Sequence, residues 1–267
     1  RFLFFLCLLP PLTVMSDAMG RTTASRAALA ASYLVKAQLG SGFFRYEHDF
    51  LSGRASKKNN IVRQAGTTYA LAEYLAQFPG AQVEAALQRA WQALATASIS
   101  WGDGSLVTVD GNPDKAKAGA TALALLSLLM DAKSPAAVER VLAAGWLKGL
   151  LALQMPNGGF AARPDSTKQS AYSNGEIWLA LARYAALYPE HAAAAAALQR
   201  ADDFMIRNYG VSPEIGFFHW GVMAAAARYA HTGKQRFVDF IVQQTGIFLE
   251  QLRPRVKPDS NSCYSVD

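Results

Sequence analysis

Three short clusters of polar and aromatic residues carry the side chains that acid–base chemistry requires, and each lies just before or at the start of an apolar stretch. The first cluster combines an aromatic ring, two carboxylates, an imidazole, two amides and a guanidinium: Tyr46, Glu47, His48, Asp49, Asn59, Asn60 and Arg63. The planar fork of Arg63 suits a carboxylate or phosphate on a substrate. The alternative is a structural Arg63 that pairs with Glu47 or Asp49. We expect Tyr46, His48, Asp49, Asn60 and Arg63 to bind substrate.

The second cluster runs from Tyr172 to Glu176, and Glu176 is the only charged residue between Lys168 and Arg183. A lone carboxylate that opens an apolar helix is costly to bury unless it is paired. Burial would raise its pKa, which suits a general acid or base. The alternative is a carboxylate that the helix N-terminus stabilises. We predict a catalytic role for Glu176 and a substrate-binding role for Tyr172.

The third cluster is His219 and Trp220, which follow two phenylalanines. Histidine titrates near neutral pH and is a natural acid–base group, and the indole could stack on a sugar ring. The alternative is a core histidine that is hydrogen-bonded to backbone. We predict that His219 is catalytic and that Trp220 binds substrate.

An internal repeat indicates how these clusters are positioned. Four apolar stretches each have a glycine near their start, at intervals of roughly 50 residues: Gly66, Gly119, Gly175 and Gly221. Glycine inside a helix costs about 1 kcal/mol relative to alanine, so its recurrence suggests close backbone approach in the first turn of each helix. Because Arg63, Glu176 and His219 each lie within about one turn of such a glycine, we expect all three near one mouth.

Amphipathic helices with more charge are expected between the apolar ones, over Ser25–Gln38, Gln82–Ala97, Ala136–Gln154, His191–Asn208 and Lys234–Gln251. An amphipathic helix faces water on one side, whereas a helix that is apolar all round must be covered on both. The sequence therefore predicts an all-α fold in two layers, with the glycine-led helices inside. Short extended pieces are plausible at Phe43–Tyr46 and Ser105–Val109.

Two turns resemble the Gln-x-x-x-Gly-Gly-Phe turns of α/α-toroid proteins: Gln154 to Phe160, and a degenerate copy from Gln38 to Phe44. The superfamily includes six-hairpin glycosidases, sugar epimerases of the N-acylglucosamine type, and terpenoid cyclases with protein prenyltransferases. The resemblance implies an (α/α) toroid of helical hairpins whose mouth is lined by the loops before the inner helices. It specifies a fold more than a function. An open α-solenoid is the alternative.

The remaining features bound the class of protein. The apolar run Phe2–Leu12 and the small residues after it resemble a secretory signal, so we assign residues 1–20 to a signal peptide with a clipped start; a stray apolar tail or a core helix is the alternative. Residues 21–267 would form one toroid domain, incomplete at its C-terminus, because a fifth inner helix would begin near Cys263.

The formal charge is +6 without a basic stripe, which argues against a nucleic-acid partner. We expect no stable membrane span, no metal and no cofactor.

These observations lead to one main hypothesis and two others. The main one is a secreted or periplasmic carbohydrate-active enzyme that acts on a sugar or uronic acid by hydrolysis, elimination or epimerisation. The partner would be a carbohydrate or another small polar substrate. The others are a non-catalytic glycan- or peptide-binding module and an α-hairpin interaction scaffold. No nucleophile elbow, phosphate loop, zinc-spaced histidine pair or dinucleotide fingerprint is present.

Overall fold

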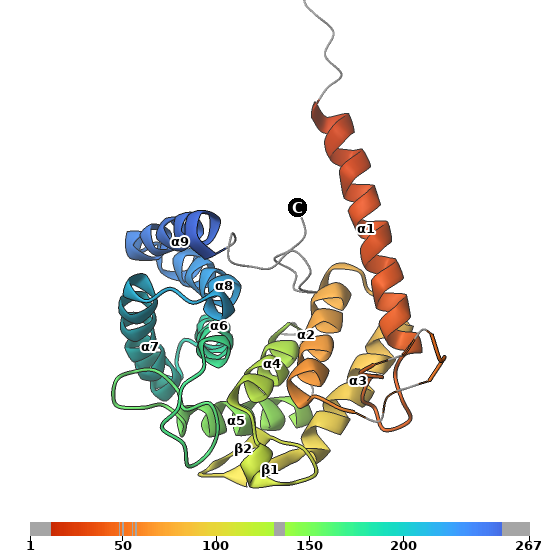
Figure 1. Cartoon of the computed structure of the whole chain (residues 1–267), viewed down its shortest axis with the longest axis horizontal. Coiled ribbons are helices and arrows are strands. Elements are labelled where there is room, and N and C mark those ends of the chain that lie inside the picture. Colours follow the sequence, from red (N-terminus) through yellow and green to blue (C-terminus); the bar gives the residue numbers. More distant parts are fainter. Residues whose placement is uncertain are drawn as a thin grey trace, which may run out of the picture.

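The computed structural model describes residues 12–252, apart from residues 48, 50, 55, 57 and 131–136. This part of the chain is mostly helical, as predicted, with nine α-helices and one short β-hairpin (Figure 1). In chain order the elements are α1 (Leu12–Lys36), α2 (Ile61–Gln77), α3 (Ala81–Thr96), β1 (Ser98–Trp101), β2 (Gly104–Val107), the 3₁₀ turn η1 (Pro113–Lys115), α4 (Ala118–Leu129), α5 (Ala137–Leu151), α6 (Ala171–Leu187), α7 (Ala192–Val211), α8 (Ile215–Thr232), α9 (Gln235–Ile247) and the π-helical turn η2 (Phe248–Leu252).

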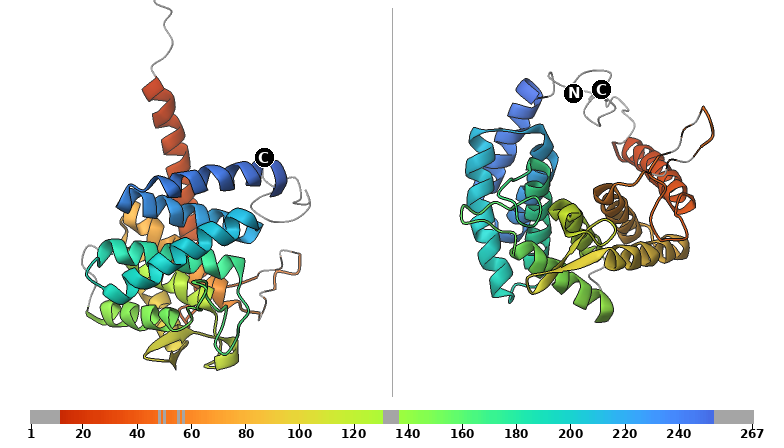
Figure 2. Two further views of the ribbon diagram at one scale, coloured as in Figure 1. Left: turned by 90° about the vertical axis from the view of Figure 1, so that its left-hand side faces the viewer. Right: turned by 60° about the horizontal axis from the view of Figure 1, so that its bottom comes forward.

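The helices form two layers (Figures 1 and 2). Helices α2, α4, α6 and α8 pack side by side in that order, and α3, α5, α7 and α9 each pack against one of them. The first set contains the four glycine-led apolar stretches, and the second contains four of the five amphipathic helices. All twelve residues of α4 are buried, which is the burial expected of a helix without charges that is covered on both sides.

The layer formed by α2, α4, α6 and α8, called the inner layer below, is strongly curved. Its first and last helices approach each other through their side chains, since the ring centroids of Tyr69 in α2 and Trp220 in α8 lie 6.3 Å apart. The elements follow an arc from α1 to α9, which is clear in the right-hand view of Figure 2. The N-terminal ends of α2, α4 and α6 therefore lie near one another.

The turn after α5 begins the connection to α6 of the inner layer, and its hydrogen bonds hold it against α7. The Gln154 side-chain amide donates hydrogen bonds to the carbonyl oxygens of Gly158, at 3.2 Å, and of Ala197 in α7, at 2.8 Å. The Arg200 guanidinium, also in α7, donates to Oε1 of Gln154. Gly158 has a φ of +97° and lies against the Arg200 carbonyl, where a Cβ would clash. Only glycine adopts this conformation so close to backbone without strain.

The turn after α1 repeats the same arrangement. The Gln38 amide donates to Gly42 O at 2.9 Å and to Ala86 O in α3 at 2.8 Å. Arg89 of α3 donates to Gln38 Oε1, and Gly42, with a φ of +87°, lies against the Arg89 carbonyl. The two turns that resemble each other in sequence are therefore equivalent in hydrogen bonding, and each ties one outer helix to the next.

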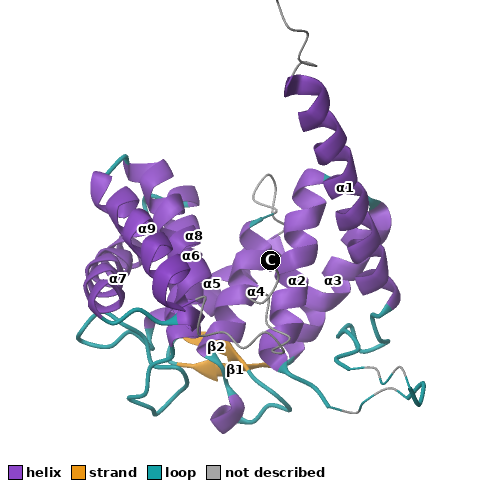
Figure 3. Cartoon of the chain, turned by 45° about the horizontal axis from the view of Figure 1, so that its top comes forward, coloured by secondary structure: helices purple, strands orange, loops and turns teal. Residues whose placement is uncertain are grey.

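The loops before the inner helices gather at one end of the molecule (Figure 3). Helices α2, α4 and α6 each use their fourth residue to hold the preceding loop. The hydrogen bonds run from Phe44 N to Gln64 Oε1 at 2.7 Å, from Val107 N to Thr121 Oγ1 at 2.9 Å, and from Phe160 N to Asn174 Oδ1 at 2.9 Å. All three acceptor side chains belong to buried residues. Each hydrogen bond therefore fixes the position of the loop relative to the first turn of the helix that follows it.

The structure corrects the expected register of the repeat. The four glycines are not all in the first turn: Gly119 is the second residue of α4, Gly175 the fifth of α6, Gly66 the sixth of α2 and Gly221 the seventh of α8. In α2, α4 and α6 the equivalent position is instead the fourth residue, which holds the preceding loop. The glycines also differ in how closely neighbouring helices approach them. A Cβ at Gly66 would have ordinary contact with Leu123, whereas one at Gly175 would lie 2.6 Å from Trp220 Cβ.

The structure agrees with some of the remaining expectations about element boundaries and strands and differs from others. Helix α1 begins at Leu12, earlier than the expected Ser25, and so includes part of the region assigned to the signal peptide. Residues 1–11 and 253–267 lie outside the described residues. The extended piece expected at Ser105–Val109 corresponds to β2, which pairs antiparallel with an unexpected β1. Phe44, within the other expected piece, forms only an isolated bridge to Gln38.

Candidate functional site

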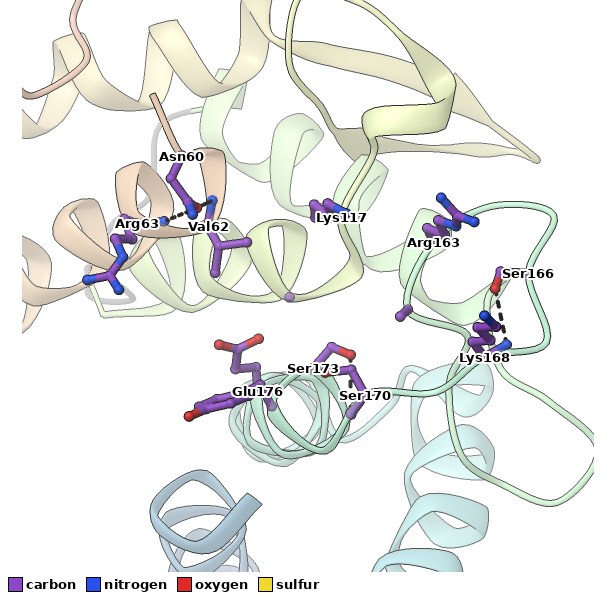
Figure 4. A pocket seen from close by; sticks show the side chains of 13 residues that line it. Asn60, Val62, Arg63, Lys117, Arg163, Ser166, Lys168, Ser170, Ser173 and Glu176 are labelled. Carbon is purple, nitrogen blue, oxygen red and sulfur yellow. Dashed lines mark hydrogen bonds between the residues drawn. The ribbon is translucent and has the colours of Figure 1, made fainter. Parts of the chain in front are cut away.

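A cavity of about 500 Å³ opens at the N-terminal ends of α2, α4 and α6 (Figure 4). The N-cap residues of these helices, Asn60, Lys117 and Ser170, all line it. The helix dipole gives the N-terminus of a helix a positive potential. Three such ends around one cavity favour an anionic occupant.

Four cationic side chains also line this cavity: Arg63 from α2, Lys117 before α4, and Arg163 and Lys168 from the loop between α5 and α6. All four residues are exposed, and none forms an ion pair with another described residue. Figure 4 shows Arg63 on one side of the cavity and Arg163 and Lys168 on the other. Cationic groups that form no ion pair with the described residues and are spread around a cavity are suited to binding an anion.

Glu176 is the only carboxylate among the lining residues and differs from the cations in being 4% exposed. Within the described part of the chain, no hydrogen bond or ion pair reaches its carboxyl group. Burial raises the pKa of Glu176 from 4.5 to about 7, because desolvation disfavours the charged form. At neutral pH both protonation states are therefore populated, which is the condition for efficient proton transfer.

Gly119 makes room for this carboxyl group. A Cβ at Gly119 would clash with Oε2 of Glu176 and lie 3.5 Å from the Cβ of Ser173. The absence of a side chain at the start of α4 thus lets the Glu176 carboxyl lie against backbone at the cavity wall. This is one glycine of the repeat whose close approach serves the cavity directly.

Four of the residues predicted to form the site line this cavity, namely Asn60, Arg63, Tyr172 and Glu176. Asn60 also has a structural role, since its side-chain oxygen caps α2 by accepting hydrogen bonds from the backbone N–H groups of Val62 and Arg63. Their roles in binding or catalysis stay predictions.

The other predicted residues that the structure describes are not among those that line the cavity. Tyr46 lies near it through Arg63, whose guanidinium carbon is 6.0 Å from the Tyr46 ring centroid. Asp49 is exposed and accepts hydrogen bonds from Leu51 and Ser52 within its own loop. His48 lies outside the described residues.

His219 and Trp220 lie on α8, where it packs against α6. Trp220 is close to Gly175 of α6 and to Tyr69 of α2. His219 is half-buried, and desolvation lowers its pKa below the usual value of 6.5. Since neither residue lines the cavity, the structure joins Arg63 with Glu176 but does not add His219 to them.

Sequence reasoning missed three of the four cations, Lys117, Arg163 and Lys168. Lys117 was visible as the last charge before the apolar stretch that became α4. Arg163 and Lys168 lie in the loop just after the Gln154 turn. A search for basic residues in the loops before inner helices would have found them.

A comparison with models of known protein families finds no match for this chain, and a comparison with curated proteins finds none either. Among the described helices, none combines the length and the apolar character that crossing a membrane requires. Within the same residues, no three His, Cys, Asp or Glu side chains are grouped so that they could hold a metal ion. A functional interpretation therefore depends on the chemistry of the cavity.

Proposed function

We propose that the chain is a carbohydrate-active enzyme that removes a proton from the carbon next to the carboxylate of a uronic acid. The observation that carries this proposal is the Glu176 carboxyl at the wall of a cavity with four cations: it is buried, has no hydrogen-bond or ion-pair partner among the described residues, and has a pKa that burial raises to about 7. Glu176 would be the base.

The cations suit this reaction because charge moves onto the substrate carboxylate as the proton leaves. Groups that are already oriented towards developing negative charge stabilise the transition state more than the ground state. Arg63, Lys117, Arg163 and Lys168 are candidates for that role, together with the N-terminal ends of α2, α4 and α6.

Among hydrolysis, elimination and epimerisation, hydrolysis is the least supported. Most glycosidases use two carboxylates, whereas Glu176 is the only one among the residues that line the cavity. In elimination, Glu176 takes the proton from the carbon, the C–H electrons form a C=C bond, and the leaving oxygen departs with the electrons of its broken bond and takes a proton from water. In epimerisation, water returns a proton to the same carbon on its opposite face. Proton removal is common to both.

The experiment is hydrogen exchange at that carbon. Uronic acid oligosaccharides are incubated with the protein in deuterated water, and NMR follows deuterium at the carbon next to the carboxylate. Ultraviolet absorbance detects the conjugated double bond of elimination. Glu176→Gln should slow both by about 100-fold or more. Glu190→Gln, an exposed site in the turn after α6, is the matched control and should leave both rates unchanged.

A non-catalytic glycan-binding module is the second candidate. It is favoured by the position of His219, since only one of the two predicted acid–base groups lines the cavity. In that case uronic acid oligosaccharides bind and Arg163→Gln weakens binding, but neither exchange nor elimination is detected with the wild-type protein.

The proposal includes an (α/α) toroid as the fold and secretion as the destination. The toroid is supported by the curvature that brings Tyr69 and Trp220 together and by the two equivalent turns at Gln38 and Gln154. An interaction scaffold that spreads its polar residues along an open surface is less supported, because Arg63 and Glu176 share one cavity. Secretion rests on the apolar run Phe2–Leu12 alone.

A further inference from the structure

A second cavity of about 700 Å³ lies beside the first and shares two lining residues with it, Ser170 and Tyr172. It is formed by the start of α6, the end of α7 and the start of α8. The two cavities are therefore neighbours on either side of Tyr172. A ligand longer than one sugar could occupy both.

The chemistry of the second cavity differs from that of the first. Its lining contains no cation and one carboxylate, Glu214, whereas the first contains four cations. Its other polar side chains are three amides, from Asn157, Gln169 and Asn208, and the hydroxyls of Ser170, Tyr172 and Tyr209. Amides hydrogen-bond to neutral hydroxyl and acetamido groups, and an unneutralised carboxylate such as Glu214 disfavours a second anion.

Two of these polar groups are available to a ligand. The side chains of Asn208 and Glu214 are exposed and form no hydrogen bond with any other described residue. Gln169 and Asn157 are instead used within the protein, since Gln169 accepts from Asn174 and Asn157 accepts from Gly159 N. Asn208 and Glu214 are thus the groups from which ligand specificity in the second cavity would come.

Tyr172 forms the wall between the cavities and is held in place from behind. A Cβ at Gly216, the second residue of α8, would lie 2.6 Å from Cε2 and 3.0 Å from Cζ of Tyr172. The ring therefore lies directly against backbone, while Tyr172 remains 50% exposed. A fixed, half-exposed ring is a suitable surface for stacking a sugar.

We propose that the ligand is an oligosaccharide in which an anionic sugar is joined directly to a neutral one. The anionic sugar lies in the first cavity, the neutral sugar lies in the second, and Tyr172 contacts both. This inference rests on the proposed function for the anionic sugar, and it adds the neutral neighbour. An oligomer made only of uronic acids would place a second carboxylate beside Glu214 and bind less tightly.

The test compares three sets of hexasaccharides by isothermal titration calorimetry with Glu176→Gln, in which turnover should be slow enough for binding to be measured. One set alternates uronic acid with N-acetylhexosamine in several linkages, the second contains uronic acids only, and the third is neutral. The best alternating ligand should bind at least about 10-fold more tightly than any ligand of the other sets. One added hydrogen bond together with a lost repulsion accounts for a difference of this size.

A second substitution in the same background assigns the cavities. Asn208→Ala should weaken the alternating ligand about 5-fold or more and leave the uronic acid oligomer unchanged, whereas Arg163→Gln should weaken both. Gln199→Ala removes an exposed amide elsewhere on α7 and should change neither. Circular dichroism and melting temperature establish that each variant is folded.

The outcomes separate the two proposals. If uronic acid oligomers bind as tightly as alternating ones and Asn208→Ala changes nothing, the neutral neighbour is refuted while the proposed function stands. If no anionic oligosaccharide binds, the proposed function fails and this inference fails with it. Tightest binding by the neutral set would likewise refute both.

Discussion

Replacing Glu176 by glutamine should change how the stability of the protein depends on pH. Glutamine keeps the shape of the side chain and removes the titrating group. In the wild-type protein, burial raises the pKa of Glu176 from 4.5 to about 7, so the folded state binds this proton more tightly than the unfolded state. The stabilisation is fully present below pH 4.5 and is lost as the pH rises through 7.

The size of the effect follows from the change in pKa. Each pH unit between the two pKa values corresponds to about 1.4 kcal/mol, so the range from 4.5 to about 7 corresponds to about 3 kcal/mol. The stability of Glu176→Gln relative to the wild type should therefore rise by about 3 kcal/mol between pH 4.5 and pH 8. The sign is opposite to that of a salt-bridged carboxylate, whose stabilisation appears as the pH rises.

The assay is urea unfolding followed by circular dichroism at several pH values between 4.5 and 8, with the linear dependence on denaturant extrapolated to water. The quantity of interest is the difference in unfolding free energy between Glu176→Gln and the wild type at each pH. Glu190→Gln is the control, and its difference should stay nearly constant. If the difference in unfolding free energy between Glu176→Gln and the wild type also stayed constant with pH, the carboxyl would not be desolvated in solution. That result would refute the argument that Glu176 acts as a base near neutral pH.

Three further substitutions test the packing that builds the site. Gly119→Ala should displace the Glu176 carboxyl at little cost in stability, because the new Cβ clashes with the flexible end of that side chain; a pH dependence of stability identical to that of the wild type would argue against that contact. Asp202→Ala should cost about 3–5 kcal/mol, since it leaves Arg228, its ion-pair partner at 2.7 Å, largely buried; calorimetric melting should separate it from a nearly neutral Asp203→Ala, an exposed neighbour. Gln154→Ala should cost about 1–3 kcal/mol by leaving carbonyl groups without donors, and proteolysis of the loop after α5 should become faster.

Local patterns in the sequence were sufficient for much of the fold. The uncharged run after Lys117 could only be a helix covered on both sides, and α4 is buried along its whole length. The turns at Gln38 and Gln154 were recognisable by their resemblance to a known sequence motif, although their amides also donate to carbonyl groups 48 and 43 residues away. The register of the repeat was harder, since glycine can serve different contacts in different helices, as Gly66 and Gly119 do.

Part of the candidate site could also be predicted from local sequence, and part could not. Glu176 was identifiable from sequence because a lone carboxylate in an apolar helix is costly and therefore conspicuous. The surroundings of Glu176 were not, because Lys117 and Arg163 are ordinary surface residues in isolation, and only the curvature of the inner layer brings them around one cavity. His219 was chosen by the same local logic as Glu176, yet the packing of α8 against α6 left it out of the cavity lining.

The sequence by itself determined that the fold is mostly helical, that the uncharged run of α4 is covered on both sides, and which carboxyl is unusual. These properties depend on contacts between residues close in the chain, where periodicity and charge are readable. The tertiary structure alone decided which N-terminal ends meet, which cations surround Glu176, and that a cavity without cations lies beyond Tyr172. Those features depend on contacts between residues far apart in sequence, whose relative positions are set by how the layers curve and pack rather than by any local pattern.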